Sequence, residues 1–232
     1  MHVTAIVVAA GAGRRMGGET VKTYLPVAGR PLVLRTLDRL FSAPRVDDVV
    51  LVVAPNDLGR CGDLLHRDDA LRDRRWSLQA GGETRQQSAK RGLEKISADT
   101  SIVLIHDGAR PFVSAGLIDR CIAAAQEKGA VVVGLPARDT IKMVGQDHLI
   151  KSTPDRNGLW EIQTPQAFQR EIILAAHAWA EREGIEATDD AMIVESMGNP
   201  VYVMEGERTN CKITVPEDIW LAEAMIRDGR VP

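Results

Sequence analysis

The sequence VTAIVVAAGAGRRMG at residues 3–17 decides the fold. Residues 3–9 are apolar enough for a buried strand, and a glycine-rich turn with two arginines follows directly. Small residues let the backbone approach a ligand closely, and consecutive free N–H groups can surround an anion. Because Arg14, Arg15 and Lys22 add three cations, the turn predicts phosphate binding.

Two better-known phosphate loops are alternatives to this turn. A dinucleotide-binding loop reads G-x-G-x-x-G, but Met16 stands at the third glycine position. The next predicted strand ends in Ala54-Pro55, so no acid is placed to hold a ribose. A P-loop contains a G-K-[ST] triplet, and Lys22 does not belong to one. The pattern favours a triphosphate loop of another kind, and a surface turn without a ligand is the simpler alternative.

Length and composition fit one α/β domain with a sizeable core. The chain has 232 residues, of which 44% are hydrophobic and 26% charged, as in ordinary globular proteins. A net charge of −3 gives no basic field, so we expect no nucleic-acid partner. No apolar run is long enough to span a membrane and no signal peptide precedes the first strand, so we expect a cytoplasmic protein without a membrane partner.

The cysteines and histidines show no metal-binding or disulfide pattern. Cys61, Cys121 and Cys211 are far apart and form no C-x-x-C pair, which is typical of free thiols in a reducing cytosol. The five histidines lack the spacing of zinc ligands.

Predicted strands and helices alternate along most of the chain. Strands are expected at 3–9, 48–53, 77–80, 102–106, 131–135 and 201–204, and helices at 31–41, 57–70, 84–96, 115–128, 169–182, 189–197 and 216–226. Such alternation predicts an α/β fold with a doubly wound, mostly parallel sheet.

The alternation breaks after residue 138. Residues 140–144 and 148–152 are predicted as two short strands, and Gly145-Gln146-Asp147 joins them as a hairpin. A loop over 153–158 follows. Excursions of this kind from a compact domain often serve as a lid or contact a partner. We therefore expect a single domain over 1–232 from which segment 138–158 protrudes as an arm.

The ends of the predicted strands carry the residues with chemistry. In open α/β sheets ligands bind outside the carboxyl ends of the strands. Besides the first turn, these ends carry Gly81-Gly82-Glu83-Thr84-Arg85, His106-Asp107-Gly108-Ala109-Arg110, Arg138-Asp139-Thr140 and Asn210-Cys211-Lys212. We expect them to converge on one cleft.

Asp107 is the candidate metal ligand. A carboxylate directly after an apolar strand is well placed to hold Mg²⁺, directly or through water, beside a triphosphate. The alternative is that Asp107 caps the next turn or pairs with Arg110. Lys212 adds a cation to the same region, and His106 is interpreted as a structural residue rather than a base.

The combination of motifs resembles the 2-C-methyl-D-erythritol 4-phosphate cytidylyltransferase family. The matching motifs are AAGAGRRM at 9–16, GGETRQQS at 81–88, HDGARP at 106–111, RDTIK at 138–142, DRNGLW at 155–160, TPQ at 164–166, TDD at 188–190 and KIT at 212–214. They run in order along nearly the whole chain. The resemblance implies a Rossmann-like nucleotidyltransferase fold.

The implied reaction is a nucleotidyl transfer. A phosphate oxygen of 2-C-methyl-D-erythritol 4-phosphate attacks the α-phosphorus of CTP, and 4-diphosphocytidyl-2-C-methyl-D-erythritol and pyrophosphate are formed. A phosphate monoester has a second pKa of about 6, so it attacks without a general base. The protein must bring two anions together and neutralise the charge that develops. The resemblance implies that Arg15, Lys22 and Lys212, with Mg²⁺ as cofactor, do this.

The resemblance also implies the binding residues. Nucleotide binding falls to Ala9, Ala10, Gly11, Gly13, Gly82, Glu83, Ser88 and Asp107, the last at the ribose and the metal. Thr164 and Thr188 match substrate positions in the body of the site. Thr140 and Arg156 match residues of an arm that embraces a second subunit, so that each site of a homodimer takes residues from its partner. For Arg156 the alternative is a salt bridge within the hairpin.

Two other functions remain open. A ribitol 5-phosphate cytidylyltransferase shares the fold and the CTP chemistry, and no single residue decides which polyol phosphate is the acceptor. A nucleotide-binding module without catalysis would bind CTP and release no pyrophosphate. The joint presence of Arg15, Lys22 and Asp107 favours an enzyme.

Overall fold

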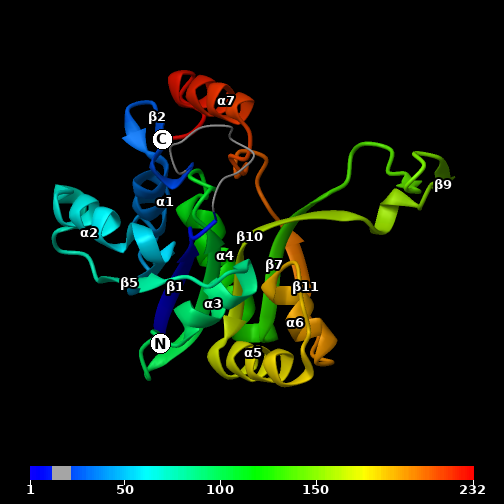
Figure 1. The fold of residues 1–232 in the computed structure, drawn as a ribbon, viewed down its shortest axis with the longest axis horizontal. Helices are drawn as coiled ribbons and strands as arrows, with labels where there is room; N and C mark the ends of the chain where they lie inside the picture. The colour runs from blue at the N-terminus through cyan, green and yellow to red at the C-terminus, as the bar shows by residue number, and fades with distance from the viewer. Residues whose placement is uncertain (12–21) are drawn as a thin grey trace.

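The computed structural model describes residues 1–11 and 22–232. Within them one seven-stranded sheet has the order β11-β7-β10-β6-β1-β4-β5 (Figure 1). Its strands are β1 His2–Val8, β4 Asp48–Val53, β5 Trp76–Ala80, β6 Thr100–Asp107, β7 Ala130–Pro136, β10 Trp160–Gln169 and β11 Tyr202–Glu205. Strand β10 is antiparallel to β6 and β7, and the other neighbouring pairs are parallel. The expectation of a mostly parallel sheet is confirmed.

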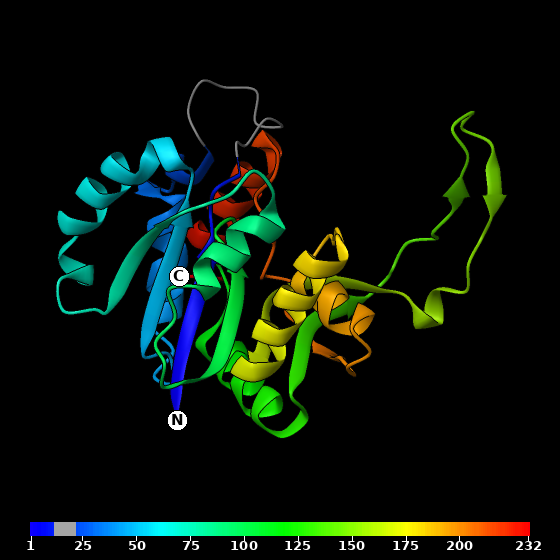
Figure 2. The same cartoon turned by 60° about the horizontal axis from the view of Figure 1, so that its bottom comes forward.

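Helices cover both faces of this sheet, as a doubly wound fold requires (Figure 2). One face is covered by α1 Leu32–Phe41, α2 Leu58–His66 and α4 Ala115–Lys128, and the other by α3 Arg85–Leu93, α5 Arg170–Glu183 and α6 Asp190–Ser196. Side chains alternate between the faces along β1, since Val3, Ala5 and Val7 belong to the first core and Ile6 to the second.

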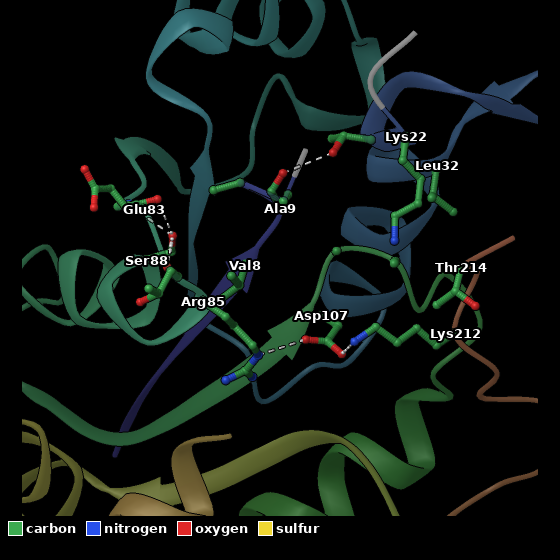
Figure 3. A pocket seen from close by; sticks show the side chains of 17 residues that line it. Val8, Ala9, Lys22, Leu32, Glu83, Arg85, Ser88, Asp107, Lys212 and Thr214 are labelled. Carbon is green, nitrogen blue, oxygen red and sulfur yellow. Dashed lines mark hydrogen bonds and ion pairs between the residues drawn. The ribbon is translucent and has the colours of Figure 1, made fainter. Parts of the chain in front are cut away.

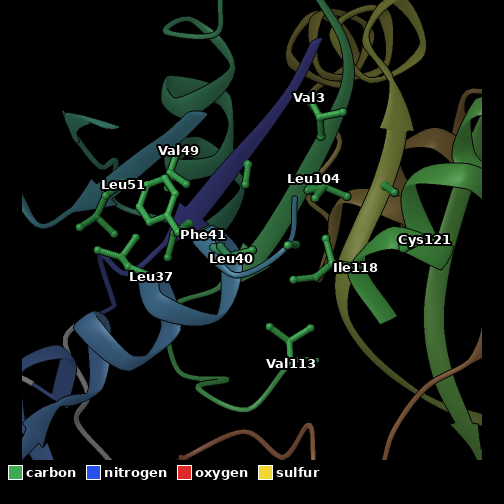
Figure 4. Packing of buried hydrophobic residues seen from close by; sticks show 14 of the residues in the cluster. Val3, Leu37, Leu40, Phe41, Val49, Leu51, Leu104, Val113, Ile118 and Cys121 are labelled. Carbon is green, nitrogen blue, oxygen red and sulfur yellow. The ribbon is translucent and has the colours of Figure 1, made fainter. Parts of the chain in front are cut away.

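The first core is built from apolar residues at helical spacing. Leu37, Leu40 and Phe41 of α1 pack beside Val49 and Leu51 of β4 (Figure 4). In the second core Phe168 of β10 is fully buried with Ile173 and Ala176 of α5. Burial on both sides explains why the central strands read as continuous apolar runs in the sequence.

Three helices begin beside the carboxyl ends of the strands, and each has a side-chain cap. Thr84 accepts a hydrogen bond from the N–H of Gln87 at 3.1 Å and starts α3. Ser114 and Asp189 cap α4 and α6 in the same way. The caps fix where each helix starts, so they also fix Arg85 and Asp190 in the first turns of α3 and α6.

The last helix, α7 Pro216–Arg227, lies beyond the carboxyl ends of the parallel strands (Figure 1). It contacts the small hairpin of β2 Pro26–Val27 and β3 Arg30–Pro31. Ile213 and Ala222 pack in a third apolar cluster with Leu32 and Phe112. This cluster holds the segment that carries Lys212 against the loops of the central strands. No helix within residues 1–11 and 22–232 has the length and apolar character to cross a bilayer.

The arm differs in detail from the expected hairpin. Its strands are β8 Met143–Val144 and β9 Ile150–Ser152, shorter than expected, and a 3-10 turn, η5 Arg156–Gly158, lies where a plain loop was expected. The left-handed residue of the turn is His148, with φ +62°, and not Gly145. The segment projects away from the sheet and its helices (Figure 2).

Strand β10 was not expected from the sequence, which predicted a loop over 153–158 and no strand or helix between that loop and residue 169. Apolar and polar residues alternate only over 160–163, and Pro165 argues against a central strand. In the structure the register with β7 shifts between Gln163 and Gln166, so Pro165 lies where the ladder needs no N–H.

The sequence analysis also missed the β2–β3 hairpin. The helix expected at 57–70 is α2 flanked by two 3-10 turns, η3 Pro55–Asp57 and η4 Asp69–Leu71.

Candidate active site

A cleft of about 410 Å³ opens at the carboxyl ends of β1, β5 and β6 (Figure 3). It is lined by Val8, Ala9, Ala10, Gly11, Lys22, Thr23, Leu32, Gly82, Glu83, Thr84, Arg85, Ser88, Asp107, Gly108, Ala109, Lys212 and Thr214. Four of the five strand-end segments expected to converge therefore meet in one place, whereas the expectation is wrong for Arg138-Asp139-Thr140, which does not line the cleft.

Close approach of the loops requires glycine at two positions. A Cβ on Gly81 would lie 2.4 Å from Cβ of Ala10, and one on Gly108 would lie 2.8 Å from Cβ of Ala9. Because real Cβ atoms do not come so close, larger residues would push the β5 and β6 loops away from the first turn. The floor of the cleft is thus backbone and methyl groups, on which a flat ligand can lie.

The loop between β5 and α3 is organised by its own side chains. The N–H of Gly82 donates to Oγ of Ser88 at 3.1 Å, and the N–H of Glu83 donates to Oε1 of Gln87 at 2.8 Å. The hydroxyl of Ser88 donates in turn to the carbonyl of Thr84 at 2.9 Å. Ser88 is buried, so the loop has a defined shape before any ligand arrives.

Lys22 connects the end of the first loop with the C-terminal segment. It starts the 3-10 turn η2 Lys22–Tyr24, and its Nζ donates to the carbonyl of Ile213 at 3.0 Å. Thr23 donates its hydroxyl to the carbonyl of Ala9 at 3.1 Å. The side chains of Lys22 and Lys212 reach the same cleft from separate segments (Figure 3).

Asp107, the last residue of β6, is a carboxylate surrounded by three cationic side chains. Its Oδ2 lies 2.7 Å from Nζ of Lys212 and 3.7 Å from Nε of Arg110, and its Oδ1 lies 3.4 Å from Nε of Arg85. Burial alone would raise the pKa of this carboxyl, but the three cations outweigh burial and hold the pKa well below its usual range. Asp107 is therefore ionised at neutral pH.

A chain of hydrogen bonds beneath the cleft fixes Asp107 through its backbone. The N–H of Asp107 donates to Oγ1 of Thr164 at 3.0 Å, and Oγ1 of Thr164 lies 3.0 Å from Nδ1 of His106. Nε2 of His106 lies 3.1 Å from the carbonyl oxygen of Arg110, which can only accept, so we assign the proton to Nε2. Nδ1 then accepts from the hydroxyl of Thr164. When the imidazole is neutral, each donor and acceptor in this series of hydrogen bonds has a partner.

This arrangement predicts a pH dependence of stability. Burial lowers the pKa of His106 to about 4, below the value of about 6.5 expected in the unfolded chain. Between these values the unfolded state binds more protons, so the free energy of unfolding falls as pH falls from about 6.5 to about 4, by up to about 3 kcal/mol. Urea denaturation at pH 7 and 4.5 measures this loss. His106→Gln, which cannot titrate, should lose less stability over that interval, and equal losses would contradict the assignment.

The structure brings together most of the residues expected from the sequence. Lys22, Lys212, Ala9, Ala10, Gly11, Gly82, Glu83, Ser88 and Asp107 line the cleft. Thr164 lies directly below, bonded to Asp107. Gly13 and Arg15 fall outside the described residues, as does Arg14.

Three expected residues do not reach the cleft of their own chain. Thr140 and Arg156 are exposed on the arm, where Nη1 of Arg156 donates to the carbonyl of Arg138 at 2.7 Å. Thr188 is exposed just before α6, and its hydroxyl contacts Sδ of Met192 at 3.8 Å.

Sequence reasoning gave no role to Arg85 or Asp190, and it named Arg110 only as an alternative partner of Asp107. Arg85 and Arg110 both face Asp107, and Asp190 is fully buried with Oδ2 2.6 Å from Nη1 of Arg85. All three belong to the motifs of the family resemblance, but no pattern in the sequence showed that Arg85 pairs with Asp190. Asp107 does lie near Arg110, as the alternative predicted, but its contact with Lys212 is shorter.

The carboxylates fit a cation that arrives with a triphosphate. In the described part of the chain no group of three or more His, Cys, Asp or Glu side chains could hold a metal ion. The cleft instead offers the carboxylates of Asp107 and Glu83. Mg²⁺ is usually bound by one or two carboxylates together with substrate phosphates, so this donor set suits Mg²⁺ better than a metal enclosed by protein ligands.

Known proteins resemble this chain over nearly its whole length. Residues 3–228 match the family model described as 2-C-methyl-D-erythritol 4-phosphate cytidylyltransferase. A relative of that name from Pelotomaculum thermopropionicum is 43% identical over 231 residues, which cover 99% of this chain and 97% of the relative. Another, from Desulforamulus reducens, is 40% identical over 226 residues, or 97% and 96% of the two chains.

Solved structures agree over the same length. The 4-diphosphocytidyl-2C-methyl-D-erythritol synthase from Anaerococcus prevotii superposes with a TM-score of 0.85 at 32% identity, covering 97% of this chain and 96% of that one. The 2-C-methyl-D-erythritol 4-phosphate cytidylyltransferase from Thermus thermophilus gives a TM-score of 0.79 at 37% identity, covering 98% and 100%.

Proposed function

The chain belongs to the 2-C-methyl-D-erythritol 4-phosphate cytidylyltransferase family, and from that premise we propose how its cleft carries out the reaction. The enzyme is a nucleotidyltransferase that forms 4-diphosphocytidyl-2-C-methyl-D-erythritol from CTP. The phosphate of 2-C-methyl-D-erythritol 4-phosphate attacks the α-phosphorus of CTP, and pyrophosphate leaves. The observation that supports the mechanism best is the cluster of Lys22, Lys212 and Asp107 in one cleft.

We infer that catalysis is mainly electrostatic. The acceptor phosphate is largely dianionic above its second pKa of about 6, so it needs no base to attack. Two anions repel each other unless the protein supplies positive charge on both sides. Lys22 and Lys212 face the cleft from separate segments and, with Arg15 of the first loop, would stabilise the charge on the five-coordinate phosphorus.

The nucleotide is held by the first turn and the β5–α3 loop in this proposal. Ala9, Ala10, Gly11 and Gly13 would follow the phosphates and ribose, and Gly82, Glu83 and Ser88 the cytosine. The preformed loop around Ser88 supports this division, because hydrogen bonds within the loop fix its shape before the base binds.

Asp107 would hold the divalent cation, which we propose to be Mg²⁺. When bound, such an ion neutralises phosphate charge and orients the triphosphate. In the present structure Lys212 compensates Asp107 at 2.7 Å. We propose that Lys212 turns toward a phosphate oxygen once a cation compensates Asp107.

We propose that the acceptor binds over Thr164, which supports Asp107 from below, and extends beyond the cleft toward the exposed Thr188 of its own chain and the arm of a second chain. Large apolar side chains are exposed along the arm, which supports burial against a partner: Ile141, Met143, Val144, Leu149 and Ile150. Because Thr140 and Arg156 do not reach their own cleft, we propose a homodimer in which they reach the partner's cleft. We also propose a cytoplasmic location, since Cys61, Cys121 and Cys211 are free thiols, as in a reducing compartment.

Mixed dimers test the arm. Lys22→Met and Arg156→Ala enzymes should each be nearly inactive. In a mixed dimer the cleft of the Arg156→Ala subunit has Lys22 and receives an unaltered Arg156. A random 1:1 mixture should therefore recover about a quarter of the wild-type activity, because half of the dimers are mixed and each has one intact site. If mixing restores nothing while co-purification of two differently tagged chains shows mixed dimers, the shared site is wrong.

An acceptor assay tests the substrate. The enzyme is given CTP, Mg²⁺ and either 2-C-methyl-D-erythritol 4-phosphate or ribitol 5-phosphate, and pyrophosphate is followed. We expect faster turnover with the first. Faster turnover with ribitol 5-phosphate would reassign the acceptor, and CTP binding without pyrophosphate from either would indicate a binding module.

A further inference from the structure

A row of paired side chains leads from the interior to the cleft. Nε2 of His177 in α5 lies 3.0 Å from Oδ1 of Asp190, and Oδ2 of Asp190 lies 2.6 Å from Nη1 of Arg85. Nε of Arg85 lies 3.4 Å from Oδ1 of Asp107. Asp190 is 0% exposed and His177 is 4% exposed, so this carboxylate has no access to water.

Asp190 is held rigidly at the start of α6. Its backbone N–H and that of Ala191 both donate to Oε1 of Gln166 at 3.1 Å. Nε2 of Gln166 donates to Asp189, the cap of the same helix, at 2.7 Å. Strand β10 and helix α6 therefore fix the carboxylate from below, and His177 occupies its second oxygen.

Arg85 is bound unequally by its two carboxylates. The 2.6 Å contact with Asp190 is a short charge-assisted hydrogen bond, whereas the 3.4 Å contact with Asp107 is long (Figure 3 shows the latter). Although burial opposes it, Asp190 first and Asp107 second raise the pKa of Arg85, so the guanidinium stays charged. Asp107 keeps its shortest contact, 2.7 Å, for Lys212.

We propose that Asp190 is a positioning residue that holds Arg85 back from Asp107, so that Asp107 keeps its charge for the catalytic cation. The inference rests on the role proposed for Asp107. A guanidinium can bind a carboxylate through two parallel hydrogen bonds, and such a pair would neutralise Asp107 and occupy both of its oxygens. With Asp190 as its stronger partner, Arg85 steadies Asp107 without this closure.

The proposal predicts a specific defect when Asp190 loses its charge. In Asp190→Asn the carboxylate of Asp107 still lies beside Arg85, and the guanidinium should close on it. Binding of a divalent cation beside CTP should then weaken about tenfold or more, because the cation must compete with a charge-assisted hydrogen bond for the oxygens of Asp107. Mn²⁺ serves as the probe, and the electron paramagnetic resonance signal of free Mn²⁺ reports binding to the full-length protein with CTP but no acceptor.

A second-site change separates this role from a merely structural one. In the double variant Arg85→Gln/Asp190→Asn no guanidinium is left to close on Asp107, so Mn²⁺ binding should return to within about threefold of wild type. The double variant also removes the buried ion pair as a unit, so it tests the proposal even if Asp190→Asn fails to fold. A double variant as weak as, or weaker than, Asp190→Asn would overturn the proposal.

Two controls distinguish the possible failures. Glu181→Gln removes an ion pair with Lys90 between α3 and α5 that lies at the surface, and it should leave Mn²⁺ binding unchanged. Asp107→Asn should lower Mn²⁺ binding sharply. If Asp107→Asn binds Mn²⁺ as wild type does, both the role of Asp107 and this inference are wrong. If Asp107→Asn is defective but Asp190→Asn is not, the inference alone is overturned.

Discussion

Replacing Lys22 by methionine should lower kcat by about 10²-fold or more while the protein stays folded. The ammonium group lies in the cleft and donates 3.0 Å to the carbonyl of Ile213, next to Lys212. Methionine keeps much of the length and apolar body of the side chain and removes the charge that the transition state needs. Pyrophosphate release under saturating substrates measures the effect.

The control for Lys22 is a lysine outside the cleft. Lys90 pairs with Glu181 at the surface, so Lys90→Met should keep its rate within about twofold, since surface pairs contribute little. Thermal unfolding of both variants shows whether the fold is intact. If Lys22→Met turned over at near wild-type rate, the transition-state role of this residue would be refuted.

Replacing Phe168 by alanine should cost about 3–5 kcal/mol of unfolding free energy, the largest stability effect that we expect from one core substitution. Phe168 is 0% exposed near the end of β10 and packs in the second core with α5. Its loss removes apolar area and leaves a cavity that close-packed neighbours fill only in part. Urea unfolding at fixed protein concentration measures the difference.

Two variants calibrate that measurement. Phe168→Leu keeps most of the volume and should cost clearly less than alanine. Leu221 is 54% exposed on α7, so Leu221→Ala should change stability by less than about 0.5 kcal/mol. Equal losses for Phe168→Ala and Leu221→Ala would mean that β10 is not packed as described.

The architecture could be predicted where local pattern and tertiary environment agree. Apolar runs at 3–9, 48–53 and 102–106 are buried on both faces, so each reads as a strand without help from its neighbours. Helices were expected from residues 84 and 115, and in the structure Thr84 and Ser114 cap the helices that start there. Convergence of strand ends followed from the parallel arrangement, and this is why Asp107 and Lys212 could be placed in one cleft.

Strand β10 could not be predicted because its reasons lie elsewhere in the chain. Gln163, Thr164 and Gln166 are polar yet buried, since they bond to Glu207, Asp107 and Asp189. A sequence window shows only polar residues around a proline, which is typical of a loop. Only the assembled sheet explains them.

The pairing of Arg85 with Asp190 was hidden for the same reason. The two residues are 105 positions apart, and their contact exists because the starts of α3 and α6 meet beside β10. Each stands in a motif that could be quoted from the sequence, yet neither motif says which partner its charge finds. Thr140 and Arg156 were expected to act in the site of a partner chain, and they are exposed on the arm, outside the cleft of their own chain.

The position of β10 also sets the order in which the chain can assemble as it is made. Strands β1, β4, β5 and β6 pair directly with one another, so this half of the sheet can form once residue 107 is free. Strand β7 pairs with β10 and β11, both of which follow the arm, so its apolar residues wait for partners until residue 169 and beyond have left the ribosome. Because β10 also carries Thr164 and Gln166, the nascent enzyme gains the support of Asp107 and Asp190 in the step that closes its sheet.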